Sequence, residues 1–160
     1  IFLSFIYGMS KDNIKKLITK LLDIDCAMKG LKFFDYFKKI GEWKNEQILL
    51  AERFGCSKSF CGNARYLQNK GESSYNEKRW IPNQIIQGTA SFILKKSILE
   101  LSSNLNYINF LIPMHDAILL EFPNECIEET KAIIEKIFIN NFSTICPNIT
   151  AGISFEEFAE

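Results

Sequence analysis

The sequence has only one histidine, and its five cysteines include no pair at the C-x-x-C spacing. One histidine cannot form a His-rich metal cluster. An odd number of cysteines without close pairs argues against a disulfide framework or a zinc site. Free thiols suit a reducing compartment. We therefore expect an intracellular protein, in the cytoplasm or nucleoid, or in an organelle or nucleus if the source is eukaryotic.

The chain also has no net charge, because its 19 basic and 19 acidic residues balance. This balance gives no whole-molecule signal for nucleic acid or membrane, although a local basic surface remains compatible with it. No apolar run approaches the roughly 20 residues of a membrane span, so no membrane partner is expected. Residues 1–9 lack the charged leader and cleavage site of a signal peptide. The sequence opens on Ile1 within an apolar pattern, which suggests further chain upstream.

The first third of the chain shows the apolar periodicity of amphipathic helices. Ser10 can cap a first helix that runs from Lys11 to about residue 22. A second helix is predicted over residues 28–40, with Gly41 at its end, and a third over residues 42–54. This part of the chain is therefore expected to be helical throughout.

The amino-acid composition of the chain changes at Gly55. Residues 55–74 are rich in Gly, Ser, Asn and Cys, which predicts a loop with short irregular strands around residues 56–67. A helical turn over residues 76–80 is expected to precede a strong helix over residues 83–101.

The last 50 residues combine strand and helix patterns. Two short apolar arms, residues 108–112 and 117–122, predict a β-hairpin whose strands are buried. Asn124 can cap a helix that runs to about residue 142, and residues 149–154 alternate as a closing strand would. Helices followed by a hairpin, a helix and a strand predict an α+β fold.

The hairpin tip carries the only histidine of the chain, His115, next to Asp116. A carboxylate on rigid β-structure can bind Mg²⁺, and metal ions assist phosphoryl transfer by positioning and charge neutralisation. One carboxylate cannot hold two metals, and Glu121 lies farther along the strand. The alternative is an ordinary turn that happens to contain His-Asp.

A second polar set consists of Arg79, Asn83 and Gln87, which recur at i, i+4 and i+8. This spacing places all three on one side if the segment is helical. Such a row of donors suits the minor groove, which offers mainly acceptors. The alternative is a solvated polar stripe. Pro82 complicates the first turn of this helix or begins it.

Two shorter motifs have equally open interpretations. In Tyr7-Gly8-Met9-Ser10 an aromatic ring beside a helix end can meet a nucleobase, or Tyr7 is the last core residue of its helix. In Gly62-Asn63-Ala64-Arg65 the arginine can contact phosphate, or it is solvated on a surface turn.

Taken in order, the four motifs resemble the C-terminal part of family A DNA polymerases, the bacterial polymerase I type. The resemblance covers nearly all of the chain, and the Gln87-Gly88-Thr89-Ala90 helix followed by His115-Asp116 is its most specific part. It implies part of a right-hand polymerase fold. Residues 1–54 would be fingers, comprising the end of the nucleotide-binding helix and the helices after it. Residues 55–160 would be an irregular hairpin region and the palm with its catalytic hairpin.

The resemblance also implies a function. The complete protein would add deoxynucleotides to a primer 3′-end on a DNA template, in replication or repair, with two Mg²⁺. Its partners would be primer–template DNA, deoxynucleoside triphosphates, and the upstream palm and thumb of the same polypeptide. This segment alone is not expected to polymerise, because the first metal-binding aspartate and the triphosphate-gripping Lys and Arg of the family lie upstream.

Site residues follow from the resemblance position by position. Leu3, Tyr7 and Gly8 would lie in the site for the incoming nucleotide and templating base. Asp116 would be one of two metal-binding aspartates and hence catalytic. The remaining positions would bind the primer–template: Arg65, Arg79, Asn83, Gln87 and His115.

The sequence departs from the family at four positions in or next to these motifs. Leu3 stands where the family has Phe or Tyr, and Ser4 replaces Gly. Asn63 replaces the first Arg of Gly-Arg-x-Arg, and Ala117 replaces the Glu of His-Asp-Glu. Two alternatives therefore accompany the polymerase hypothesis: a degenerate, non-catalytic nucleic-acid-binding relative, and an unrelated α+β interaction domain with coincidental motifs.

Overall fold

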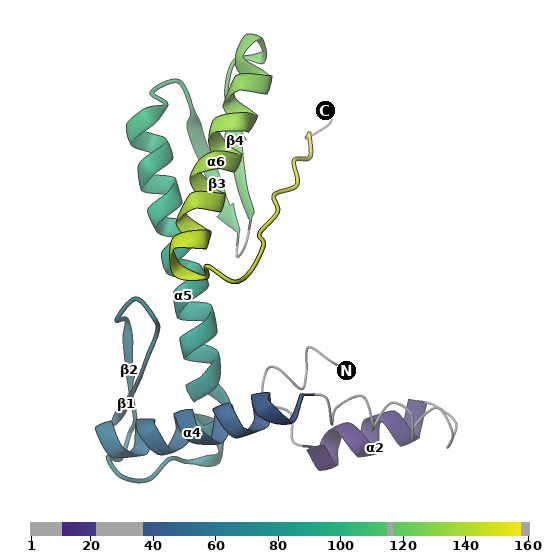
Figure 1. Cartoon of the computed structure of the whole chain (residues 1–160), viewed down its shortest axis with the longest axis vertical. Coiled ribbons are helices and arrows are strands. Elements are labelled where there is room, and N and C mark those ends of the chain that lie inside the picture. Colours follow the sequence, from purple (N-terminus) through teal and green to yellow (C-terminus); the bar gives the residue numbers. More distant parts are fainter. Residues whose placement is uncertain (1–10, 22–36, 115–116, 158–160) are drawn as a thin grey trace. The chain divides into compact units, whose positions relative to one another are not determined.

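A computed structural model of the chain describes residues 11–21, 37–114 and 117–157 (Figure 1). Within these residues the protein combines helices with two antiparallel hairpins, which confirms the predicted α+β class. The chain divides into two compact units, Ile1–Gly88 and Thr89–Glu160. This division falls inside a helix, and the predicted division into fingers and palm after residue 54 stays a prediction.

Helices open the first unit. Helix α2 spans Lys11–Leu21, as the periodicity predicts, and Ile18 on it is buried. Helix α4 spans Lys38–Phe54. The prediction that a helix ends at Gly41 is wrong, because α4 runs through this residue. An interior glycine costs a helix only about 1 kcal/mol, which is too little to end it.

Helix α4 ends where a residue with left-handed backbone is needed. Gly55 has φ 77°, and its N–H donates to the Ala51 carbonyl at 2.7 Å. The chain then enters the hairpin of β1 (Cys56–Lys58) and β2 (Ala64–Tyr66), which pairs Cys56 with Tyr66. These are the short strands predicted around residues 56–67.

Helix α5 spans Tyr75–Asn104 without interruption. The sequence predicted a separate turn over residues 76–80 and a helix from residue 83. Both predicted segments are helical, but the predicted break between them is wrong, since Pro82 lies inside the helix and is fully buried. Proline removes one hydrogen bond, the N–H that would reach the Lys78 carbonyl. Burial of Ile81 and Pro82 offsets that loss.

The hairpin packs against α5 within the first unit. Ala51, Leu67 and Ile81 form a buried cluster. The buried Ser57 hydroxyl donates to the Ile81 carbonyl at 2.9 Å. A Cβ atom on Gly88 would lie 2.9 Å from the Ser59 Cβ, so helix and hairpin approach more closely there than a side chain allows.

The second hairpin pairs β3 (Asn109–Met114) with β4 (Ala117–Glu121), close to the predicted arms. Its strands are less buried than predicted. Leu111, Ile112 and Met114 are each about half exposed, while Phe110 and Leu120 pack on the core. The pairing register shifts between Phe110 and Ile112, and all residues from 111 to 114 are exposed, so simple alternation of buried and exposed side chains does not hold at this end of β3.

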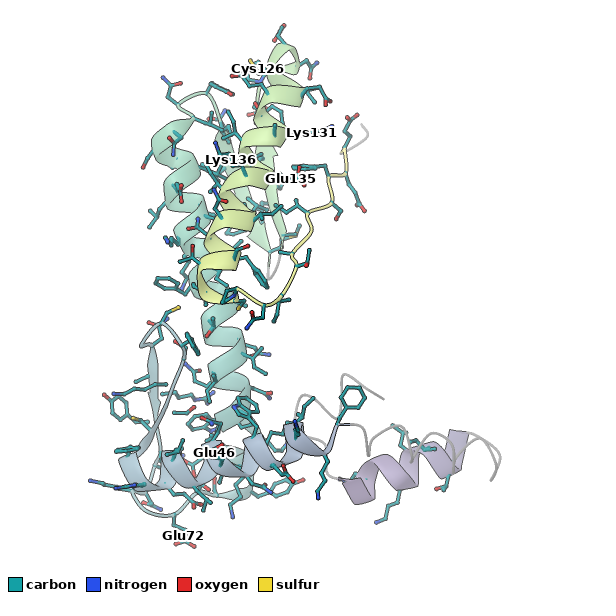
Figure 2. The ribbon with its side chains drawn as sticks, in the orientation of Figure 1. Glu46, Glu72, Cys126, Lys131, Glu135 and Lys136 are labelled. Carbon is teal, nitrogen blue, oxygen red and sulfur yellow. The ribbon has the colours of Figure 1, made fainter. Side chains whose placement is uncertain are left out.

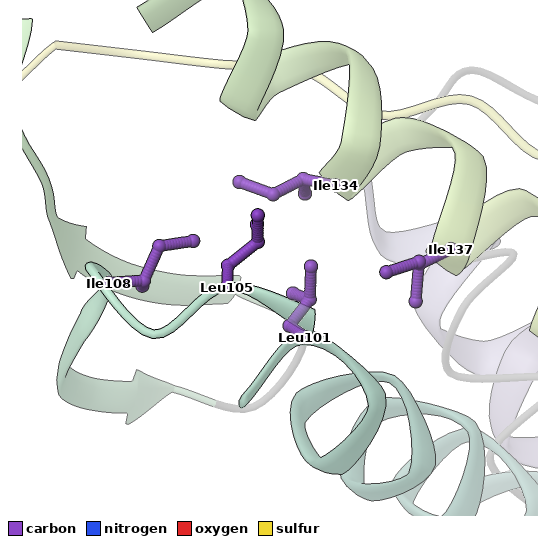
Figure 3. Close-up of a cluster of buried hydrophobic side chains, with 5 residues drawn as sticks. All are labelled: Leu101, Leu105, Ile108, Ile134 and Ile137. Atoms are coloured by element: carbon purple, nitrogen blue, oxygen red, sulfur yellow. The ribbon is translucent and has the colours of Figure 1, made fainter. Parts of the chain in front are cut away.

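Helix α6 (Ile127–Ile145) covers the inner face, after the 3₁₀ turn η1 (Asn124–Cys126). The predicted side-chain cap by Asn124 is wrong: neither η1 nor α6 has a capping side-chain hydrogen bond, and Asn124 instead begins the 3₁₀ turn. Figure 3 shows the core between α5, the segment after it and α6. The core consists of Leu101, Leu105, Ile108, Ile134 and Ile137.

The predicted closing strand over residues 149–154 is also wrong. These residues adopt no regular structure, and no described strand pairs with them. Strand character in a sequence produces a strand only where a partner offers hydrogen bonds.

Among the described helices, none combines the length and apolarity that crossing a membrane requires.

Candidate nucleic-acid interface

The predicted row of donors lies on one continuous helix. Arg79, Asn83 and Gln87 all belong to α5, one turn apart. Arg79 and Gln87 are exposed, whereas Asn83 is half-buried. A hollow of about 250 Å³ is lined by Asn76, Arg79, Trp80 and Asn83. The structure therefore brings two of the three residues to one hollow, and Gln87 follows on the next turn.

Arg65 reaches the same region from β2. Its guanidinium carbon lies 4.2 Å from the centroid of the Trp80 ring, a cation–π stack. Arg65 and Trp80 also line a larger hollow of about 350 Å³ together with Tyr66, Gln68, Ser74, Asn76 and Glu77. Both hollows share Asn76 and Trp80, so they adjoin. Arg65 and Arg79 thus line adjoining hollows that share Trp80.

Glu77 fixes both ends of the loop that follows β2. Its two carboxylate oxygens accept hydrogen bonds from the Gln68 and Ser74 backbone N–H groups, both at 2.8 Å. These bonds, with that from the Ser74 side chain, lower the pKa of Glu77, and the positive charge of Arg65 lowers it further. The Glu77 carboxylate is therefore ionised and holds the loop through these bonds, although the residue is buried.

Glu52 on α4 fixes the same loop from a second side. Its Oε1 atom accepts hydrogen bonds from the Ser73 hydroxyl at 2.5 Å and from the Ser73 N–H at 3.2 Å. These bonds lower the pKa of Glu52, as the nearby Lys78 does to a smaller extent. Two carboxylates, one from each helix, thus fix the loop that borders the larger hollow.

The other acidic side chains described in this unit line neither hollow. Glu46 on α4 and Glu72 on the loop are exposed and line neither of them (Figure 2). In the second unit, Lys131 on α6 pairs with Glu128 and Glu157. Exposed pairs of this kind stabilise a protein little. Among the described residues that line the two hollows, Glu77 is the one carboxylate, and its oxygens already accept hydrogen bonds from backbone N–H groups.

The other predicted site residues lie outside the described residues. These are Leu3, Tyr7, Gly8, His115 and Asp116. Within the described ranges, no group of three or more His, Cys, Asp or Glu residues is arranged to hold a metal ion.

Glu121 lies at the end of the β3–β4 hairpin away from its turn. It lies four residues along β4 from Ala117, about 13 Å at the rise of an extended strand. Its carboxylate accepts a hydrogen bond from the Asn109 side chain at 3.1 Å, at the opposite end of the hairpin from the turn. In the described strands of the hairpin, residues 109–114 and 117–121, the one carboxylate is Glu121, and it lies away from the turn.

Sequence reasoning missed Trp80, Tyr66 and the clamping carboxylates Glu52 and Glu77. The one available signal was Trp80, a large aromatic directly after Arg79. No local pattern reveals that Glu52 accepts bonds from a residue 21 positions later.

Comparison with known proteins identifies similar chains. The family model described as DNA polymerase family A matches residues 1–153. DNA polymerase I of Borreliella burgdorferi is 29% identical over 136 residues, which are 78% of this chain and 15% of that protein. The thermostable DNA polymerase I of Thermus filiformis is 25% identical over 122 residues, 72% of this chain and 15% of that protein.

A solved structure shares the fold. The POL domain of Pol1 from M. smegmatis, in complex with DNA primer–template and dNTP, superposes with a TM-score of 0.73 at 20% identity. The match covers 87% of this chain and 26% of that structure. The chain thus spans a small part of the length of the relatives that it matches.

Proposed function

Because the chain belongs to DNA polymerase family A, we propose that it is the C-terminal part of a DNA-directed DNA polymerase. The complete protein would add deoxynucleotides to a primer 3′-end on a DNA template, in replication or repair. A reaction on DNA would also place the protein inside the cell, in the cytoplasm or nucleoid, or in an organelle or nucleus.

One observation supports the proposal above the others: Arg65 stacks on Trp80, and Arg79 and Asn83 line the adjoining hollow together with Trp80. Arginine forks bind phosphate oxygens in bidentate geometry. Asn83 and Gln87 follow on the same helix and can donate to acceptors in the minor groove. Phosphate contacts from the arginines would fix the duplex, and the amides would follow its groove. His115 would lie by the primer terminus.

The nucleotide site would be formed elsewhere in the chain. We assign Leu3, Tyr7 and Gly8 to the site for the incoming deoxynucleoside triphosphate and the templating base. Leu3 replaces an aromatic residue of the family, so discrimination between nucleotide sugars is where this protein would differ most.

Asp116 would supply one carboxylate for Mg²⁺, and the second would come from the upstream palm of the same polypeptide. Bound Mg²⁺ would neutralise charge on the attacking 3′-oxygen and the departing pyrophosphate. The role of this chain would be to hold its single carboxylate at the tip of the β3–β4 hairpin.

The test is primer extension by the full-length protein carrying Asp116→Ala. Extension should fall below detection while primer–template binding stays within a few-fold, because one metal ligand is lost and the arginines remain. Glu121→Ala is the matched control, a carboxylate lost from the same hairpin, and should extend normally. Undiminished extension by Asp116→Ala contradicts the assignment.

The alternative is a non-catalytic, nucleic-acid-binding relative. It is favoured by Ala117, which lacks the family's carboxylate next to Asp116, and by Asn63, which lacks an arginine. The same experiment separates the two: a wild-type full-length protein that binds primer–template and extends nothing supports the alternative.

A further inference from the structure

Helix α4 exposes large apolar side chains on the face turned away from the core of the first unit. Ala51 is buried, and Ile48 packs against the cluster that contains it. On the other side of the helix, Leu49, Leu50 and Phe54 are 65%, 39% and 63% exposed. Apolar side chains that gather on a surface mark an interaction site, whereas singly scattered ones need no explanation.

Two opposite charges lie on the same face of α4, one at each end of the leucine pair. Glu46 and Arg53 are both exposed, and their separation of seven residues is nearly two full turns. At about 100° of rotation per residue, Leu49 and Leu50 lie on opposite sides of the line that joins Glu46 to Arg53. The exposed face is therefore acidic, then apolar, then basic along the helix.

Arg53 is held next to the apolar residues by its neighbour in the sequence. Its guanidinium carbon lies 5.5 Å from the centroid of the Phe54 ring, a cation–π contact. Stacking uses the flat face of the guanidinium and leaves its N–H edge available for a carboxylate. Glu46 and Arg53 line neither of the two hollows near Trp80, so this face is separate from the proposed DNA contact.

This order of residues is complementary to itself when two copies of α4 run antiparallel. Glu46 and Arg53 lie equally far from the point midway between Leu49 and Leu50, about 5 Å along the helix axis. A two-fold axis through that point places Glu46 of each copy opposite Arg53 of the other. It also brings the two Leu49 side chains together on one side of the line of contact, and the two Leu50 side chains together on the other.

Charge complementarity favours a second copy over an unrelated partner. A different helix would have to present a base opposite Glu46, leucine-sized side chains in the middle and an acid opposite Arg53. A second α4 meets all three requirements. Contacts in which the same patch of each subunit meets the other about a two-fold axis are also the commonest way in which soluble proteins form oligomers.

We propose that the face of α4 formed by Glu46, Leu49, Leu50 and Arg53 binds the same face of a second copy, so that the full-length protein forms a two-fold dimer. The contact goes beyond the proposed function and does not depend on it. Because the apolar patch is small, the dimer is weak and depends on protein concentration.

Sedimentation velocity of the full-length protein without DNA, over a series of concentrations, measures this association. The wild type should shift from monomer to dimer as the concentration rises. Leu50→Glu should weaken dimerisation by about tenfold or more, because two carboxylates would then meet beside the two-fold axis. Leu99→Glu is the matched control, since Leu99 is 69% exposed on α5, and it should dimerise as the wild type does.

Charge reversal tests the two-fold pairing itself, at exposed positions outside the core. Glu46→Arg alone and Arg53→Glu alone should each prevent dimerisation, because like charges would face each other at both ends of the contact. An equimolar mixture of these two single variants should form a heterodimer, since a basic face then meets an acidic one. The double variant that carries both substitutions should dimerise as the wild type does.

Three results would overturn the dimer. They are a wild-type protein that stays monomeric throughout the series, a dimer that persists in Leu50→Glu, and single charge variants that do not associate when mixed. A monomeric wild type together with a lowered unfolding temperature of Leu50→Glu would overturn it in favour of a different occupant, an upstream part of the same polypeptide that covers α4. Primer extension tests the proposed function separately from all of these results.

Discussion

Glu77 holds the loop beside Arg65 by accepting two backbone N–H bonds. A carboxylate in this role stabilises the fold only while it is ionised. Because its pKa is lowered in the folded state, the unfolded chain binds the proton more readily. The stabilisation is therefore complete above the ordinary value of 4.5 and is lost as pH falls through the lowered value.

The first prediction tests this clamp with Glu77→Gln. At pH 7 the variant should unfold at lower urea than the wild type, because a neutral amide accepts the N–H bonds more weakly. The difference should shrink below pH 4.5 as the wild-type carboxyl takes up its proton. Urea titrations at pH 7 and pH 3 measure it. Glu72→Gln, an exposed change on the same loop, should match the wild type at both.

The second prediction contrasts two glycines. Gly88→Ala places a Cβ atom 2.9 Å from the Ser59 Cβ and should destabilise the protein by about 1–3 kcal/mol through overpacking. Gly41→Ala meets nothing within 4 Å and should stabilise α4 by about 0.5–1 kcal/mol. Thermal unfolding of the two variants measures both. Equal effects of the two substitutions would contradict the close approach of α5 and the β1–β2 hairpin.

Among the elements, helix α5 contributes residues to both units. Its first half carries Arg79 and Trp80, and its second half contributes Leu101 to the core of the second unit. Its contact with α6 also includes a buried polar group. The Asn141 side chain donates to Ser97 at 3.2 Å and to Glu100 at 2.9 Å. A buried amide that meets two acceptors fixes how one helix lies on the other.

The third prediction tests that contact. Asn141→Ala should destabilise the protein by about 1–3 kcal/mol, because the fully buried Ser97 hydroxyl loses its partner. Asn140→Ala is the matched control, since Asn140 is the same residue type one position earlier and is exposed. Hydrogen exchange of α6 amides, followed by mass spectrometry, should report faster exchange in Asn141→Ala alone. Similar exchange in both variants would refute this role.

At the scale of the whole molecule, the proposed DNA contact predicts a salt dependence. Arg79→Ala in the full-length protein should weaken primer–template binding by a similar factor for all sequences, because a phosphate contact does not read bases. The slope of log affinity against log salt should fall by about one. Lys38→Ala removes an equal charge from α4 and should leave the slope unchanged. A sequence-dependent loss in Arg79→Ala would assign this residue to base readout instead.

How much of this protein was predictable depends on the separation of the interacting residues. The helical position of Arg79, Asn83 and Gln87 follows from their spacing of four residues, which matches the helix repeat. The β3–β4 hairpin follows from two short apolar arms. Both features are local. The predictions at Gly41 and Pro82 were wrong because tertiary packing outweighed local propensity. The prediction of a closing strand over residues 149–154 was wrong because no described strand pairs with these residues.

The sequence by itself determined the family, the α+β class and the positions of the two hairpins, because these are encoded in motifs and in short-range patterns. The tertiary structure alone decided that Arg65 stacks on Trp80, that Glu52 and Glu77 hold one loop, and that Gly88 touches the hairpin. Such contacts join residues 9 to 29 positions apart, counting from Gln68–Glu77 to Ser59–Gly88. They form only after the hairpin packs on α5, so no local pattern in the chain specifies them.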